Sequence, residues 1–194
     1  MWPWEHFAVG YIVVSLLGRR RACRVDDRLF AAVLFGSQFP DLVDKPLAWT
    51  FSVLPSGTTL AHSVFVAVPL SLVVLAWGRG RGDRRLAVAF VVPYLCHLPG
   101  DALYAALTVG GQPSFDALLW PLVPKAPGGT SAGLIGETLY YLGRYQTFLA
   151  RPEAVRYLLL ETGLLGTALA LWVGDGRPGL GLFGHIVSRF RSWQ

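Results

Sequence analysis

Six ionisable side chains lie in or beside strongly apolar stretches of this sequence, and their types suit metal chemistry. They are three of the four histidines and three aspartates: His6, Asp41, Asp44, His62, His97 and Asp101. Imidazole and carboxylate ligands together suit zinc, manganese or iron, and paired carboxylates are common in two-metal hydrolytic sites. The set therefore predicts a site for one or two divalent metal ions, with zinc favoured over manganese and iron.

The spacing of these residues adds detail to the prediction. His97 and Asp101 are four residues apart, so on a helix they project from one face. Asp41 and Asp44 are three apart and follow Pro40, which predicts a loop or a short turn there. Either aspartate could act as a general base instead of a ligand.

Each of the six residues also has an ordinary explanation when it is taken alone. Asp41 could cap a helix, Asp44 could pair with Lys45, and a single histidine at an interface is usually just hydrogen-bonded. If the apolar segments alternate across the membrane, all six fall near its extracytoplasmic face. This convergence favours the metal site, because ionisable residues within membrane segments are costly and mark function by default.

The composition requires lipid as part of the solvent. Of the 194 residues, 53% are hydrophobic and only 15% are charged, whereas soluble domains carry about 25% charged residues. The net charge of +5 comes almost entirely from arginines beside apolar runs. That arrangement is typical of membrane orientation and disfavours nucleic acid as a partner.

Five apolar segments are the predicted membrane elements: residues 4–17, 29–39, 60–77, 86–109 and 155–173. A span needs about 20 residues, so the first two segments are short and could be tilted or form half-helices. A further segment, 134–149, is predicted as an interfacial amphipathic helix or an ordinary packed helix. The expected fold is an all-α integral membrane bundle of about four to five apolar segments, forming a single membrane-embedded domain over residues 1–194.

The basic residues predict the orientation of this bundle. If the five segments alternate, twelve of the seventeen basic residues fall on one side, in three groups: residues 19–28, residues 79–85, and Arg177, Arg189 and Arg191. Excess Lys and Arg marks the cytoplasmic side. We therefore expect a multi-pass protein of the inner (plasma) membrane. Its first segment is expected to be retained and not cleaved as a signal peptide. The metal site then lies on the extracytoplasmic side, and His185, on the opposite side, plays no part in it.

Three other residues have weaker claims to function. Glu161 lies inside segment 155–173, where it could line a substrate path or could simply pair with Arg144 or Arg156. Cys23 and Cys96 are predicted to be inert thiols, since two separated cysteines indicate neither a disulfide framework nor a Cys-rich zinc site.

The motifs that carry these residues resemble a known family. They are 6–10 (HFAVG), 36–44 (GSQFPDLVD), 62–63 (HS), 97–103 (HLPGDAL) and 119–122 (LWPL). In this order they resemble the membrane-bound predicted metal-dependent hydrolases whose bacterial members include LexA-regulated inner-membrane proteins. That family is similar in motif to zinc-dependent phospholipases C.

The resemblance covers about residues 4–123 and leaves 124–194 as an added amphipathic segment, last transmembrane helix and basic tail. One departure concerns the residues before His62. The family often carries His-Arg there, but this chain reads PSGTT over 55–59, so a ligand or phosphate-binding cation is missing from that segment.

The predicted function is that of a membrane-bound, phospholipase C-like metal-dependent hydrolase. Its expected substrates are phosphoester bonds of membrane lipid or other interfacial molecules, because the site would lie at the lipid interface. The alternative is a non-enzymatic membrane protein, either a transporter or a structural or stress-response component. Transporters usually show internal repeats, and this sequence has none. A purely structural metal site is a third interpretation, but such sites are usually closed and Cys-rich.

Overall fold

The computed structural model describes residues 1–108, 110–128 and 133–181. Within these ranges the chain forms six α-helices and no strand, which confirms the all-α prediction. The helices are α1 (Pro3–Arg19), α2 (Asp27–Trp49), α3 (Val64–Gly80), α4 (Arg84–Thr108), α5 (Gly133–Leu149) and α6 (Ala154–Gly174). His185, Arg189 and Arg191 lie outside the described residues.

Helix α2 is much longer than the predicted segment 29–39, because it continues through Pro40 and Pro46. A proline inside a helix removes one backbone donor, and this is tolerated where neighbouring helices or side chains satisfy the freed groups. Asp41 and Asp44 therefore lie on α2, about one helical turn apart, and the prediction that they sit on a loop or short turn is wrong.

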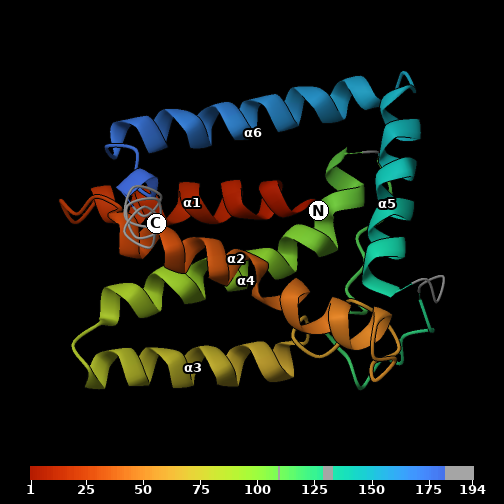
Figure 1. The fold of residues 1–194 in the computed structure, drawn as a ribbon, viewed down its shortest axis with the longest axis horizontal. Helices are drawn as coiled ribbons and strands as arrows, with labels where there is room; N and C mark the ends of the chain where they lie inside the picture. The colour runs from red at the N-terminus through yellow and green to blue at the C-terminus, as the bar shows by residue number, and fades with distance from the viewer. Residues whose placement is uncertain (109, 129–132, 182–194) are drawn as a thin grey trace, which may run out of the picture.

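Helix α4 is the centre of the bundle and packs against α1, α2, α3 and α6. Figure 1 shows α1, α3 and α6 running alongside one another, with α4 inclined among them and α5 standing across the end of α6. Two glycines allow the closest approaches: a Cβ at Gly36 would collide with the carbonyl oxygen of Phe90, and one at Gly10 would lie 2.6 Å from Cβ of Pro93. These contacts bring α1 and α2 tightly against α4 and so fix the register of the site residues that all three carry.

Among the described residues, two helices are long and apolar enough to cross a membrane, α4 and α6. This is fewer than the four to five apolar membrane segments predicted. Helix α3 is apolar but has 17 residues, and α1 and α2 carry the polar site residues, which lower their hydropathy. The most apolar stretch of α4 is 44% buried, whereas that of α6 is only 6% buried. The side chains of α6 therefore face outward, as a lipid solvent favours.

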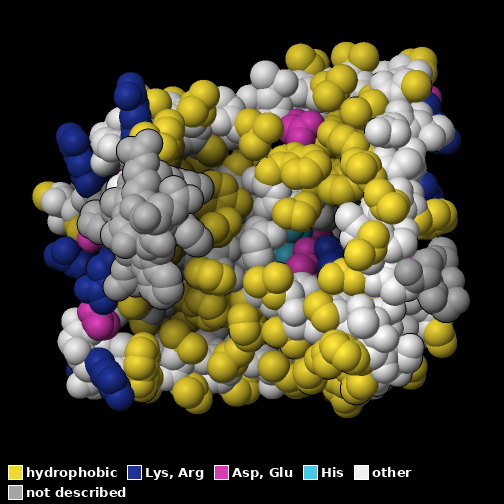
Figure 2. Space-filling model, viewed as in Figure 1, with side chains coloured by type: hydrophobic (Ala, Val, Ile, Leu, Met, Phe, Trp, Pro, Cys, Tyr) yellow, Lys and Arg dark blue, Asp and Glu magenta, His cyan; other side chains and the backbone are white. Residues whose placement is uncertain are grey.

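Most of the described arginines lie at one end of the bundle, whereas Arg144 and Arg151 lie with Trp2 and Tyr104 at the other. The connections α1–α2 and α3–α4 carry exposed arginines there, and Figure 2 shows these basic side chains grouped on the left. At the same end the Arg19 guanidinium donates to Asp175 at 2.8 Å, and Ser15 and Tyr11 donate to its other oxygen, so the end of α6 is tied to α1. The start of α1, the end of α2 and the end of α4 consequently meet at the opposite end.

Candidate metal centre

The six predicted site residues all come to the end of the bundle opposite most of the arginines. His6 lies on α1, Asp41 and Asp44 on α2, and His97 and Asp101 on α4. His62 lies in the turn that precedes α3, two residues before that helix begins. The predicted segment 60–77 therefore begins in this turn, before the helix itself. All are buried except Asp101, whose side chain is 23% exposed.

Four of these residues form a compact cluster: Asp41, His62, His97 and Asp101 offer ligand atoms that all lie within 4.8 Å of one another. The Nε2 atoms of His62 and His97 are 3.2 Å apart, and each is 3.4 Å from Oδ2 of Asp101. Oδ1 of Asp41 is 3.7 Å and 3.9 Å from the same two nitrogens. His97 and Asp101 share one face of α4, as their spacing predicts.

The hydrogen bonds made by the Nδ1 atoms of His62 and His97 set the tautomer of each imidazole, and so determine which ring nitrogen points unprotonated toward the cluster. Nδ1 of His97 is 2.7 Å from the backbone carbonyl of Ser37, which can only accept, so this nitrogen donates. Nδ1 of His62 is 2.8 Å from Oδ2 of Asp44 and donates to that carboxylate. In the neutral imidazoles both Nε2 atoms then present lone pairs to each other. This arrangement is unfavourable unless a proton or cation lies between them, and histidines with such partners are typical metal ligands.

Two buried polar atoms at the cluster support a cation as the missing partner. Oδ1 of Asp41 and Nε2 of His6 are buried without a hydrogen bond, although His6 Nε2 lies 3.1 Å from Oδ1 of Asp101. Buried polar groups are nearly always satisfied, so such exceptions point to an ion or a water as the partner. Nitrogen and carboxylate ligands in this number fit a divalent transition metal.

His6 and Asp44 stand just behind the four-residue cluster. The ring of His6 stacks on that of His97, with centroids 3.5 Å apart. Asp44 is fully buried, and its oxygens accept from the backbone amides of Thr59, Ala61 and His62 as well as from the His62 ring. The geometry therefore turns Asp44 toward the back of His62 and away from the cluster.

The charges around His62 show how negative the cluster is. Burial alone would lower the pKa of this histidine, but hydrogen bonding to Asp101 and Asp44 and the charge of Asp41 raise its pKa to about 9. The carboxylates that stabilise a proton here would equally stabilise a metal cation in its place.

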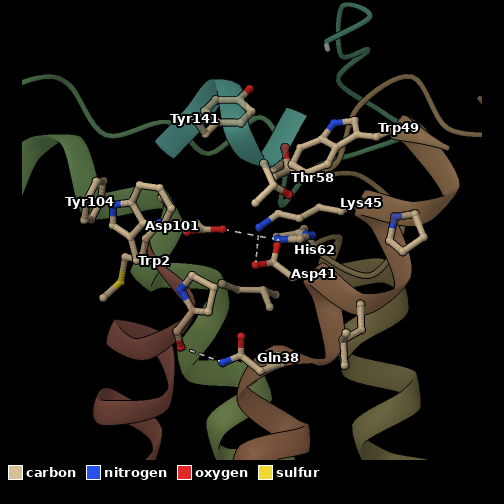
Figure 3. A pocket seen from close by; sticks show the side chains of 18 of the residues that line it. Trp2, Gln38, Asp41, Lys45, Trp49, Thr58, His62, Asp101, Tyr104 and Tyr141 are labelled. Carbon is tan, nitrogen blue, oxygen red and sulfur yellow. Dashed lines mark hydrogen bonds and ion pairs between the residues drawn. The ribbon is translucent and has the colours of Figure 1, made fainter. Parts of the chain in front are cut away.

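A pocket of about 790 Å³ opens in front of the cluster and exposes Asp41, His62 and Asp101 to its interior. Figure 3 shows these three side chains pointing into the pocket together with Lys45 and Thr58, and Figure 2 shows the same hollow surrounded by hydrophobic side chains.

Lys125 also lines this pocket, and its Nζ donates to Oγ1 of Thr58 at 2.6 Å. Thr58 belongs to the segment in which the resembling family often carries His-Arg. Sequence reasoning missed both pocket lysines as site residues. The sequence did give one indication, because alternation of the five segments puts both lysines on the same side of the membrane as the site.

Of the three residues with weaker claims, Glu161 has structural partners. Glu161 accepts from Trp4 Nε1 at 2.6 Å and from the Tyr145 hydroxyl at 3.4 Å, not from either arginine that the sequence suggested. Cys23 and Cys96 are free thiols, each partly exposed.

The helices and this cluster define an all-helical membrane protein with a buried group of side chains able to hold a metal ion. Residues 1–174 match the family described as YdjM inner membrane protein, and the chain belongs to that family. The match extends beyond residues 4–123 and includes α5 and α6. No curated protein and no solved structure matches the chain significantly.

Proposed function

We propose that this chain is a membrane-bound metal-dependent hydrolase that acts on phosphoester bonds of lipid-like or other interfacial substrates. The observation that carries the proposal is the pair of imidazole Nε2 atoms that face each other at 3.2 Å beside two carboxylates, one of which has a buried oxygen without a partner. The similarity in motif to zinc-dependent phospholipases C favours a phosphoester as the bond that is cleaved.

In this proposal Asp41, His62, His97 and Asp101 hold one or two divalent ions, with zinc favoured. Such an ion supplies charge stabilisation to phosphoryl oxygens and makes water more acidic. Asp44 and the carbonyl of Ser37 hold the two imidazoles in the tautomer that a ligand needs.

Of the two aspartates that could act as a general base instead of a ligand, Asp41 is the better placed. The oxygens of Asp44 are engaged by donors, whereas Oδ1 of Asp41 faces the cluster without a hydrogen bond. Asp41 also borders the pocket, so it can reach a proton on a bound water or substrate.

The site is proposed to face the extracytoplasmic side of a multi-pass protein. The exposed arginines of the two helix connections lie at the other end of the bundle, and an excess of basic residues marks the cytoplasmic side.

The test is the metal content of the detergent-purified protein, measured by elemental mass spectrometry. Wild type is compared with the double variant Asp41→Ala/His97→Ala and with a control, Asp83→Ala/Glu153→Ala, which removes two carboxylates outside the cluster. We expect about one or two equivalents of a transition metal in wild type and control, and a loss of the metal in the cluster variant. Hydrolysis of phospholipids and soluble phosphodiesters is then measured on the same three samples.

Two results would contradict the proposal. Wild type that is free of metal and takes up neither zinc nor manganese would leave the six residues as interfacial polar groups. Metal-loaded protein that hydrolyses no phosphoester but conducts ions in proteoliposomes would favour the transporter alternative.

A further inference from the structure

The pocket in front of the cluster contains both lysines of the chain. Lys45 and Lys125 are the only lysines among the seventeen basic residues, and both line this one cavity. An arginine-rich chain thus has its two compact ammonium groups beside a carboxylate-histidine cluster, where ammonium groups suit a bound phosphate as point charges.

Lys45 is held on the rim of the cluster by its own helix. It is one turn from Asp41 on α2, and its Nζ lies 2.5 Å from Oδ2 of that residue, while Oδ1 of Asp41 faces the histidines. Nζ of Lys45 lies over the Trp49 ring, 5.7 Å from its centroid, and the stem passes Gly57, where a Cβ would be 3.1 Å from Lys45 Cγ. The ammonium is therefore fixed between the cluster and the open pocket, as Figure 3 shows.

Lys125 approaches the pocket from the connection between α4 and α5. Among the described residues its polar partner is the neutral hydroxyl of Thr58, and no carboxylate lies within ion-pair distance. Burial lowers the pKa of this ammonium, and the more distant charges of Asp116, Asp101 and Asp44 only partly offset that effect. A half-buried cation without a close counter-ion is stabilised by an anion that binds beside it.

The wall of the pocket is apolar and continues onto the outside of the bundle. Leu34, Phe35 and Leu42 line the pocket from α2, yet their side chains are 42%, 62% and 58% exposed. In a bilayer such residues contact acyl chains, so the pocket is continuous with the lipid phase on this side. A ligand that fits it has an anionic head beside the lysines and hydrocarbon along α2.

We propose that Lys45, Lys125 and Thr58 form a subsite for the phosphate of a lipid phosphate ester, whose acyl chains lie along Leu34, Phe35 and Leu42. The inference rests on the proposed function and deepens it, because it names the substrate class and places its head group next to the metal-binding cluster. Lys125 also places a cation beside Thr58 from a distant segment, whereas residues 55–59 themselves contain no cationic residue.

The subsite is tested by binding, which needs neither the metal nor turnover. Detergent-purified, chelator-treated protein is mixed with equal amounts of phosphatidic acid and phosphatidylcholine, and bound lipid is counted by native mass spectrometry. We expect wild type to retain phosphatidic acid selectively. Lys125→Met should reduce that retention by about tenfold or more, since a hydrogen bond from a charged donor is lost, and Lys45→Met should act in the same direction. Lys125→Arg, which keeps the charge, should retain most of it, as should Arg81→Met at the opposite end.

The outcomes separate this inference from the proposed function. Equal retention of phosphatidic acid in wild type, Lys45→Met and Lys125→Met would overturn the subsite. Displacement of the lipid by glycerol phosphate or inorganic phosphate at comparable concentration would overturn the lipid as its source. Selective retention that persists in Asp101→Asn supports a subsite made by the lysines. If wild type retains the lipid selectively but binds no metal, the hydrolase proposal fails while the subsite stands.

Discussion

Replacing Asp44 by asparagine distinguishes a residue that orients a ligand from one that is a ligand. Oδ2 of Asp44 accepts from three donors, namely the His62 ring and the amides of Thr59 and His62, and Oδ1 accepts from the amide of Ala61. The carbonyl oxygen of an asparagine can take the place of Oδ2 and keep Nδ1 of His62 as a donor. Its NH2 group then faces the amide of Ala61, so at least one buried donor loses its acceptor, at a cost of about 1–3 kcal/mol.

The effect on metal affinity follows from the same contacts. Asp44→Asn preserves the tautomer of His62 but removes the negative charge that makes the ring a stronger ligand. Loss of such a supporting partner usually costs about 10–100-fold in metal affinity, or about 1.4–2.7 kcal/mol. Asp101→Asn, which alters a proposed ligand on the pocket side, should weaken binding further than Asp44→Asn does.

The assay is zinc binding to the detergent-purified protein in competition with a chelator of known affinity, together with thermal unfolding. We expect Asp44→Asn to bind zinc 10–100-fold more weakly than wild type, to unfold at a lower temperature and to keep its helical circular dichroism. Unchanged affinity would show that the contact with His62 does not support the metal. A loss as large as that of Asp101→Asn would make Asp44 a ligand and refute its assignment as a positioning residue.

Two further predictions concern the packing and the orientation of the bundle. Gly36→Ala should lower the free energy of unfolding by about 1–3 kcal/mol, because its Cβ would collide with the backbone of Phe90; thermal unfolding in detergent measures this. Gly163→Ala, on the open face of α6 with nothing within 4 Å, is the control, and equal stability of the two variants would contradict the close approach. The orientation is tested in cells with a membrane-impermeant maleimide, in a chain whose Cys96 is replaced by serine. The reagent should label Gln112→Cys, at the site end, without lysis. It should label Cys23, at the arginine end, only after lysis. The reverse pattern would place the site on the cytoplasmic side.

The sequence alone located most of the helices and named the candidate site residues. Apolar runs are the main signal for membrane helices, so the predicted segments 4–17, 86–109 and 155–173 agree with α1, α4 and α6 within a few residues. Polar side chains in such runs are costly. His6, His97 and Asp101 were therefore recognisable as candidates from their context.

The different roles of Asp41 and Asp44 in the candidate site depend on the tertiary structure. That Asp44 supports His62 while Asp41 faces the cluster depends on α2 remaining helical through Pro40 and on the amides of the turn before α3. Local sequence rules favour a break at a proline, so only packing against α4 could settle this. The lower number of helices able to span has a different cause, because α3 has only 17 residues and the polar site residues lower the hydropathy of α1 and α2.

The pocket lysines were the residues most hidden from sequence reasoning. Lys125 lies 67 residues from Thr58 along the chain, in a connection whose path has no periodicity to reveal it. The sequence shows which polar residues must be kept out of contact with lipid. It therefore indicates which residues gather at one end of the bundle. Which of them touch is set by close approaches such as that between Gly36 and Phe90, because contacts between distant segments depend on how whole helices pack.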